Sequence, residues 1–341
     1  MPPHDATSRL DPEVADGMVR SALSLWAMDG CGYRILRHNE NLACQVEDAS
    51  GRRYLLRICL PRDPAFVGIQ QQPDALESEL AWLQAIRRDT GIPVQEPVPS
   101  RGGCFIETVN HPDCEGDEKP VPCLLLTWVD GRMFDQKDAH SEHLPKEIGR
   151  VQAMLHTHAR TWHLPRGFRR PIYGETMLTA SIPEFERGVG AGIIRREHLD
   201  LVQRATERII GLLHIKPRNR DTWGPIHMDW TEGNLVVAGD TLVPIDFSLS
   251  GLGFYLQDVA QCISNLTRPL RPHYLAGYGG QFTPGELYEV SAFMLMIIFI
   301  SAAKRVFNPE WREWIQTKRL PVIVSEFCPR LLHGEPFLME V

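Results

Sequence analysis

The stretch "GPIHMDWTEGNLVVAGDTLVPIDF", residues 224–247, combines a turn pattern with polar side chains that can bind a metal or accept a proton. Its segments "NLVVA" and "TLVPI" are apolar and are separated by Gly239-Asp240, which predicts a tight β-hairpin. Pro244 suits the end or edge of its strand, because proline cannot donate a ladder hydrogen bond. Since a hairpin returns its two ends to neighbouring positions, we expect Asn234 and Asp246 to lie close together.

The chemistry of these side chains indicates a candidate site. An amide oxygen and a carboxylate are hard ligands that suit Mg²⁺, so Asn234 and Asp246 form a candidate metal pair. Asp229 could lie beside the metal without binding it and accept a proton. A single Asp or Asn in a loop is commonly a turn or cap residue, and His227 alone is typical of a structural hydrogen bond to a carbonyl. The ordered set around a hairpin is what points to function.

Composition excludes several classes of protein. The chain has 341 residues, 43% of them hydrophobic and 23% charged, which fits one large domain or two lobes of an ordinary soluble protein. A net charge of -7 argues against general nucleic-acid binding and is compatible with a cationic substrate. The eight cysteines form no CxxC pair, and the N-terminus lacks a signal pattern. The most apolar run, residues 293–300, is too short for a bilayer of ~30 Å. We therefore expect a reduced cytoplasmic protein without a nucleic-acid or membrane partner.

The pattern along the chain changes near residue 130. Residues 1–11 are expected to form a loose tail. The first part is otherwise predicted to have helices at 12–28 and 74–91, with Gly17 as a weak point, strands at 33–39, 42–48, 54–60, 104–109 and 123–129, and a polar loop at 110–120. The second part is mainly helical, with amphipathic helices at 144–162 and 196–214, which both precede the opening stretch, and further helical patterns after it. These patterns predict an N-lobe over 1–130 and a C-lobe over 131–341.

The spacing Asp-x₄-Asn, followed by Asp-Phe after a hairpin, matches the catalytic and metal loops of kinases. The chain resembles the aminoglycoside phosphotransferase-like family, which includes choline and homoserine kinases, over roughly Ala22 to Arg305. The matching pieces, in order, are "LRHNENLACQV", "GRRYLLRI", "ESELAWLQAIRRDTGIPVQEPV", "LLLTWVDGR", "IGRVQAMLHTHA", "IHMDWTEGNLVV", "VPIDFSLSGLGFYLQDVA" and "GYGG". The resemblance implies an α+β, bilobal protein-kinase-like fold: a strand-rich nucleotide-binding N-lobe with one main helix, and a mainly helical C-lobe carrying the catalytic and metal loops and the acceptor site.

The same resemblance implies an enzyme that moves the γ-phosphate of ATP to a hydroxyl of a small molecule. Asp229 would act as base or orienter, while Asn234 and Asp246 would bind Mg²⁺. Kinases generally place a Lys on the third strand to hold phosphates, and this chain has Arg57 there, which keeps the charge but is longer and planar. We expect Arg57 to pair with Glu79 rather than with Glu77.

The resemblance also implies roles for residues in the nucleotide site, in the support of the metal loop and in the acceptor pocket. The nucleotide would be bound by backbone at Thr127 and Val129, which would pair with adenine, and by the turn Asn39, Glu40 and Asn41, which would cover the phosphates. Asp258 would be structural, either holding the metal-loop region or capping a helix. The acceptor pocket is expected to include Trp230, Glu175 and Glu184, and Glu186 is a further candidate, although solvated glutamates are the more common case.

Three alternatives remain open at this stage. A protein Ser/Thr kinase would share the fold, but the segment between Asp246 and Asp258 is short for an activation segment and favours a small acceptor. A nucleotide-binding pseudokinase is compatible with Arg57 and with Ser248 after "IDF" in place of a glycine. A metallohydrolase using His227, Asp229 and Asp246 lacks a convincing cluster of further His or Asp ligands.

Overall fold

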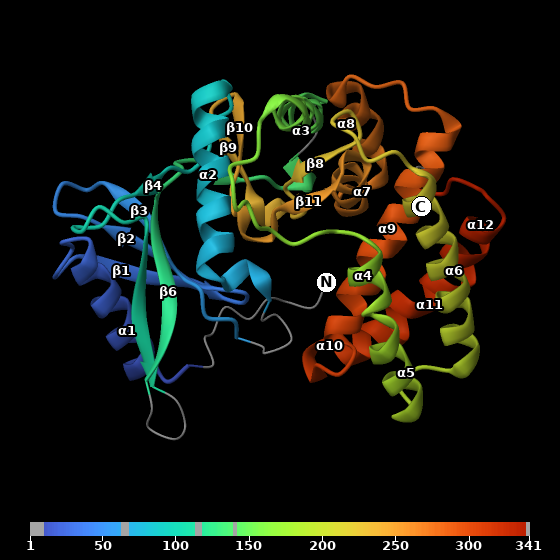
Figure 1. Cartoon of the computed structure of the whole chain (residues 1–341), viewed down its shortest axis with the longest axis horizontal. Coiled ribbons are helices and arrows are strands. Elements are labelled where there is room, and N and C mark those ends of the chain that lie inside the picture. Colours follow the sequence, from blue (N-terminus) through green and yellow to red (C-terminus); the bar gives the residue numbers. More distant parts are fainter. Residues whose placement is uncertain (1–9, 63–67, 113–117, 139–141, 339–341) are drawn as a thin grey trace. The chain divides into compact units, whose positions relative to one another are not determined.

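A computed structural model describes residues 10–62, 68–112, 118–138 and 142–338 of the chain, and these form two compact units (Figure 1). The N-terminal unit comprises the described residues from Leu10 to Asp130 together with His163–Arg170. The C-terminal unit comprises Gly131–Trp162 and the chain from Pro171 onward. Residues 1–9 of the expected tail lie outside the described residues.

The N-terminal unit is built on one antiparallel sheet of six strands. Its order is β1-β2-β3-β6-β4, with β5 also paired to β6. The strands are β1 (Gly32–His38), β2 (Leu42–Glu47), β3 (Arg53–Ile58), β4 (Pro97–Val98), β5 (Ile106–Pro112) and β6 (Glu118–Thr127), and the helices are α1 (Pro12–Leu25) and α2 (Pro73–Asp89). The polar loop predicted at 110–120 is wrong at both ends, because β5 and β6 stay paired as far as Pro112 opposite Glu118. Residues 113–117 lie outside the described residues.

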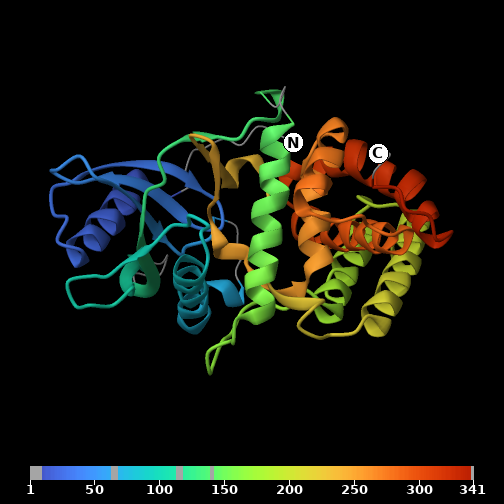
Figure 2. The same cartoon turned by 90° about the horizontal axis from the view of Figure 1, so that it is seen from above.

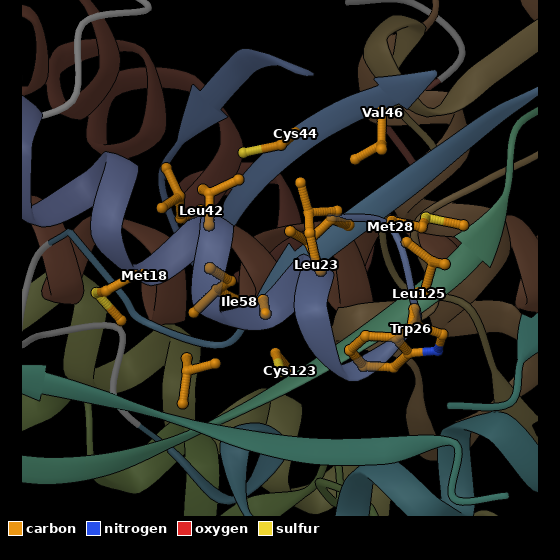
Figure 3. Packing of buried hydrophobic residues seen from close by; sticks show 14 of the residues in the cluster. Met18, Leu23, Trp26, Met28, Leu42, Cys44, Val46, Ile58, Cys123 and Leu125 are labelled. Carbon is orange, nitrogen blue, oxygen red and sulfur yellow. The ribbon is translucent and has the colours of Figure 1, made fainter. Parts of the chain in front are cut away.

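Helix α1 supplies one side of the core of this unit. It begins with Asp11 as N-cap, whose carboxylate accepts the Glu13 N–H at 2.8 Å, and with Pro12 in its first turn. Gly17, predicted as a weak point, does not interrupt the helix. Figure 3 shows how the apolar side chains of α1 meet those of the sheet. The buried cluster includes Met18, Leu23 and Trp26, with Leu42, Cys44, Val46, Ile58, Cys123 and Leu125 from β2, β3 and β6. Because one face of the sheet is covered in this way, the register of its strands is fixed.

The C-terminal unit is mainly helical, as predicted. Its helices are α3 (His143–Thr161), α4 (Glu175–Thr179), α5 (Ile182–Gly190), α6 (Arg196–Ile215), α7 (Tyr255–Asn265), α8 (Arg271–Tyr278), α9 (Pro284–Arg305), α10 (Pro309–Trp314), α11 (Leu320–Val322) and α12 (Cys328–Leu332). Its strands are β7 (Arg132–Met133), β8 (Trp223–Ile226), β9 (Leu235–Ala238), β10 (Thr241–Pro244) and β11 (Gly251–Phe254). The strands form two small sheets, β10-β9-β7 and β11-β8, and the second was not predicted.

Two glycines allow α3, seen lengthwise in green in Figure 2, to pack closely on α8. A Cβ added to Gly149 of α3 would lie 2.1 Å from the Tyr274 carbonyl oxygen. A Cβ added to Gly277 of α8 would lie 1.9 Å from the Lys146 carbonyl oxygen. Both distances are far inside van der Waals contact, so the crossing requires glycine on each helix. This crossing fixes α8 against α3.

The predicted hairpin is confirmed. Strands β9 and β10 pair from Leu235 opposite Pro244 to Ala238 opposite Thr241, with Gly239 and Asp240 as the two-residue turn. Gly239 has φ +63° and starts the turn, as in a type II′ turn. Pro244 ends β10, which is an edge strand, so its missing N–H interrupts no ladder.

The apolar run at 293–300 belongs to a longer element than the sequence indicated. Helix α9 has 22 residues and, by length and composition alone, is long and apolar enough to cross a membrane. Buried residues make up 67% of its most apolar window, including Phe293, Leu295 and Phe299. This burial is typical of a core helix, and α9 packs against α7 and α6.

Candidate active site

The loop after β8 carries the polar residues of the opening stretch in a strained backbone. Met228 has φ 62° and Asp246, just after β10, has φ 60°. Left-handed backbone is uncommon for residues other than glycine and costs free energy that the surrounding contacts must offset. Such strain concentrates at functional sites, and here it falls beside Asp229 and on the predicted metal ligand itself.

Asp258 holds the strained loop in place. Its side chain is buried, and its carboxylate accepts the Met228 N–H at 2.7 Å and the His227 N–H at 3.2 Å. His156 of α3 donates from Nε2 to the same carboxylate at 3.0 Å. Burial by itself raises the pKa of Asp258, but the hydrogen bond and positive potential from His156 and the loop donors outweigh it and lower the pKa below its usual value. Asp258 is therefore a charged anchor for the loop that contains His227 and Met228, which is one of the structural roles expected for it.

A buried polar chain extends from this anchor to α8. His156 Nδ1 is hydrogen-bonded to the Tyr278 hydroxyl at 2.8 Å, so both ring nitrogens of His156 are engaged, Nε2 with Asp258 and Nδ1 with Tyr278. Gln152, one turn before His156 on α3, donates to the Asp258 backbone carbonyl at 3.1 Å. Both side chains lie on the buried face of α3. Gln152 and His156 are polar residues within the apolar stripe of α3, and this position in the sequence is the feature that could have identified them.

Asn234 is oriented by Asp229. Its Nδ2 donates to Asp229 Oδ2 at 2.5 Å and to the Asp229 backbone carbonyl at 3.1 Å. This fixes which way the amide points, and its Oδ1 is buried with no hydrogen-bond partner among the described residues. A buried amide oxygen without a partner is costly in a folded protein. It is the atom that a hard cation would coordinate.

The hairpin brings Asp246 to the same region. The Ile245 N–H donates to the Asn234 carbonyl at 2.9 Å, so Asp246 follows directly on the residue bonded to Asn234. The Asp246 carboxylate accepts the Ser248 N–H at 3.3 Å and caps the short turn that follows. His227 joins the two loops: its Nε2 donates to the Ile245 carbonyl at 3.1 Å and its Nδ1 accepts the Asp229 N–H at 3.1 Å. His227 thus has the structural role expected of it.

In the N-terminal unit, Arg57 and Glu79 form the ion pair that the sequence favoured. Arg57 Nη1 donates to Glu79 Oε1 at 2.8 Å, and both side chains are buried. Glu77 is exposed on another face of α2. The pair joins β3 to α2, so the central strand and the helix are held in one arrangement.

The other residues predicted to contact nucleotide lie in two turns of this unit. Thr127 ends β6, its N–H donates to the Glu96 carbonyl at 2.9 Å, and its carbonyl accepts from the Gln95 side chain at 3.2 Å. A carbonyl has a second lone pair, so Thr127 keeps acceptor capacity, and Val129 follows it in half-buried chain. The β1–β2 turn is closed by a bond from the Asn39 N–H to the Asn41 carbonyl at 3.2 Å.

The residues predicted for the acceptor pocket do not come together. Trp230 is 1% exposed, its backbone N–H donates to Gln261 Oε1 at 2.6 Å, and its ring packs against His227. The indole presents no surface to an acceptor, so the structure does not support that role. Glu175 forms an exposed ion pair with His214, and Glu184 forms one with Arg187, as solvated glutamates do. The sequence also gave no indication of Arg170, which contacts Glu79 from 91 residues away.

A strand-rich unit with helices α1 and α2, and a helical unit whose β9–β10 hairpin is flanked by Asp229, Asn234 and Asp246, define a kinase-like α+β phosphotransferase fold. The sequence from residue 33 to residue 293 matches the model of the phosphotransferase enzyme family. This match covers well over half of the chain, and the chain therefore belongs to that family. Both the predicted fold and the predicted class of enzyme, a kinase-type phosphotransferase, are confirmed.

Individual relatives agree with the family assignment. Amicoumacin kinase of Bacillus subtilis (strain 168) is 24% identical over 250 residues, which span 67% of this chain and 66% of that protein. The structure of a microcompartment-associated aminopropanol kinase is similar with a TM-score of 0.76 and 23% identity, covering 95% of this chain and 99% of that one. The amicoumacin kinase hAmiN, solved in complex with AMP-PNP, Ca²⁺ and Ami, is similar with a TM-score of 0.72 and 17% identity, covering 96% and 95%. At these identities the structural likeness establishes the fold.

Proposed function

We propose that this protein transfers the γ-phosphate of ATP to a hydroxyl group of an amine-bearing small molecule, with a divalent cation and in the cytoplasm. The observation that carries the proposal is the arrangement of Asp229, Asn234 and Asp246 around the β9–β10 hairpin. Asn234 Nδ2 contacts Asp229, and its Oδ1 stays without a hydrogen bond in the described part of the chain. Met228, which precedes Asp229, and Asp246 itself both have left-handed backbone.

The roles follow from the chemistry of each group. The attacking hydroxyl oxygen forms a bond to the γ-phosphorus, the bond from that phosphorus to the ADP oxygen breaks, and ADP leaves. The hydroxyl proton passes to the Asp229 carboxylate, which the Asn234 amide orients. Because the attacking oxygen must be placed in line, orientation by Asp229 contributes to the rate in addition to proton transfer.

The residues present fit a divalent cation. Asn234 Oδ1 and the Asp246 carboxylate are hard oxygen donors, and Mg²⁺ is the cation that phosphoryl-transfer sites commonly bind through few protein ligands. When bound, the cation would neutralise charge on the phosphate oxygens. The pseudokinase alternative is disfavoured, because Asp229, Asn234 and Asp246 are all present and the loop that bears them is anchored by Asp258.

The N-terminal unit supplies the groups proposed for nucleotide binding. Arg57 would bind the α- and β-phosphates while Glu79 holds it, and the Thr127 carbonyl with the Val129 N–H would pair with adenine. The β1–β2 turn at Asn39 and Asn41 would cover the phosphates. An arginine can satisfy this role because its guanidinium is charged and offers several donors to phosphate oxygens.

A small amine-bearing acceptor is supported by two observations. One structural relative is named as an aminopropanol kinase, and aminopropanol combines an amine with a hydroxyl. The net charge of -7 is compatible with a cationic substrate. Only eleven residues separate Asp246 from Asp258, and they form a turn, strand β11 and the start of α7, which leaves little chain for docking a protein substrate.

The test is a screen of amino alcohols, aminoglycosides, sugars and amino acids with Mg²⁺ and ATP, read as acceptor-dependent ADP release. D229N should lower kcat at least about a thousandfold, because it removes both base and orienter, yet bind ATP about as tightly as the wild type. D240N, an exposed change in the hairpin turn, is the matched control and should leave kcat unchanged. Full turnover by D229N, or phosphate transfer to proteins and to no small molecule, would refute the proposal.

A further inference from the structure

A short segment between α3 and α4 docks on helix α2. Residues 163–170 group with the N-terminal unit, although the chain on both sides of them belongs to the C-terminal unit. We call these residues the docking segment; in Figure 1 they follow α3 in green. Its contacts fall on one face of α2, since Arg169 bonds to Asp74 and Ser78 and Arg170 bonds to Ala75 and Glu79. Positions spaced by four residues share a helix face, so the segment lies along α2.

The two arginines of the segment differ in environment. Arg169 Nη1 pairs with Asp74 Oδ2 at 2.7 Å, and about half of each side chain is exposed. Arg170 is buried, and its Nη1 donates to the Ala75 carbonyl at 3.0 Å and to Glu79 Oε2 at 3.3 Å. Exposed ion pairs contribute little to stability, whereas breaking a buried one has a large effect. Arg170 is thus the residue of the segment whose loss should matter.

Glu79 uses a different oxygen for each arginine. Its Oε1 accepts from Arg57 at 2.8 Å and its Oε2 accepts from Arg170 at 3.3 Å. The terminal torsion of a glutamate is soft, so a carboxylate held at one oxygen can still turn. A charged donor at each oxygen fixes the carboxylate plane, and with it the direction from which Arg57 is held. The fixed plane matters more for arginine than for lysine, because a guanidinium is planar and must be aligned as well as placed.

We propose that Arg170 is a positioning residue for the nucleotide phosphates. By holding the second oxygen of Glu79, it fixes the guanidinium of Arg57 in the orientation that grips the α- and β-phosphates. The idea rests on the proposed function, because it assumes that Arg57 binds a nucleotide. It assigns to the docking segment a role in phosphate recognition, and it explains how an arginine serves where kinases generally use a lysine.

The competing explanation is that Arg170 only secures the docking segment to α2. The two explanations predict different effects on the binding of ATP, which has phosphates, and of adenosine, which has none. A purely structural role would change protein stability and would weaken adenosine and ATP binding alike. A positioning role weakens ATP binding and leaves adenosine binding unchanged, since adenosine has no phosphate for Arg57 to contact.

The experiment measures the Kd of Mg²⁺-ATP and of adenosine by calorimetry, and the melting temperature, for the wild-type chain, R170K, R170A and R169A. We expect R170K and R170A to raise the Kd of ATP by about tenfold to a hundredfold, the range for one charge-assisted hydrogen bond, and to change the Kd of adenosine less than about twofold. R169A, the matched change in the same segment, should keep both constants within about twofold. If R170A does not fold, R170K alone tests the proposal, because lysine keeps the positive charge but lacks the planar guanidinium with its several donors.

A double variant strengthens the assignment. If Arg170 acts through Glu79 on Arg57, R57A/R170A should bind ATP only slightly more weakly than R57A, because the second change has nothing left to position. The inference is overturned if the Arg170 variants bind ATP as the wild type does, if they lose ATP and adenosine binding in equal proportion, or if the losses from R57A and R170A multiply. Failure of the proposed function looks different: the wild-type chain itself would then bind no nucleotide.

Discussion

Replacing Asp258 by asparagine tests whether a buried charge holds the catalytic loop. The carboxylate receives three hydrogen bonds, two of them at Oδ2 from the His227 N–H and His156, and one at Oδ1 from the Met228 N–H at 2.7 Å. An asparagine oxygen can take only one of these positions. In the better orientation it keeps the two bonds at Oδ2 and turns its own NH₂ toward the Met228 N–H.

The expected loss of stability follows from the number of hydrogen bonds that the substitution removes or weakens. A hydrogen bond to a charged group contributes about 1.5–3 kcal/mol, and the bonds that remain lose the charge. D258N should therefore lower the free energy of unfolding by about 3 kcal/mol. Because the freed Met228 can relax from its left-handed conformation, the loop bearing Asp229 should shift, and kcat should fall by about tenfold or more.

The pH dependence gives an independent check. The folded pKa of Asp258 is lowered: burial opposes the shift, but the hydrogen bond from His156 and the loop donors overcome it. A carboxyl with a depressed folded pKa contributes stability above its unfolded pKa of 3.8, and this contribution is lost as pH falls through the lower folded value. The difference in stability between wild type and D258N should thus be constant from about pH 5 to pH 8 and shrink below about pH 3.8.

Urea unfolding at a series of pH values, followed by fluorescence, measures these quantities, and ADP release measures kcat. D200N, which changes an exposed Asp of α6, is the control for loss of one negative charge and should leave stability within about 0.5 kcal/mol. A D258N protein as stable as D200N, or with wild-type kcat, would show that the loop does not depend on this carboxylate.

Two further predictions concern the helix crossing and the metal ligand. G277A should destabilise the protein by about 3 kcal/mol or more, because its Cβ would lie 1.9 Å from the Lys146 carbonyl oxygen. The control is G211A on the exposed face of α6, where an added Cβ meets no atom within 4 Å, and it should stabilise the protein by up to about 1 kcal/mol. Thermal unfolding of both variants measures these changes. N234A should raise the Mg²⁺ concentration for half-maximal ADP release by about tenfold or more, since the uncommitted Oδ1 is lost, and an unchanged Mg²⁺ titration would remove Asn234 from the metal site.

The sequence determined the local structure and the order of the reactive groups. Periodic apolar residues identified α2, α3 and α6, and the Gly239-Asp240 turn fixed the register that places Ile245 against Asn234. Proximity across a two-residue turn is set by the chain itself, so the neighbourhood of Asn234 and Asp246 followed without further information. The preference for Glu79 over Glu77 followed for a similar reason, because residues two apart on a helix face different sides.

Only the tertiary structure decided the contacts between distant segments. Trp230 is adjacent to Asp229 in sequence, yet its ring turns into the core, because burial of an indole depends on which elements surround it. Arg170 reaches Glu79 across 91 residues, and His156 reaches Asp258 across 102. No local pattern encodes such pairings, since they arise when whole helices and segments pack together. The sequence by itself thus determined the chemistry of the loop and hairpin, and the packing within each unit decided which buried groups hold that chemistry in place.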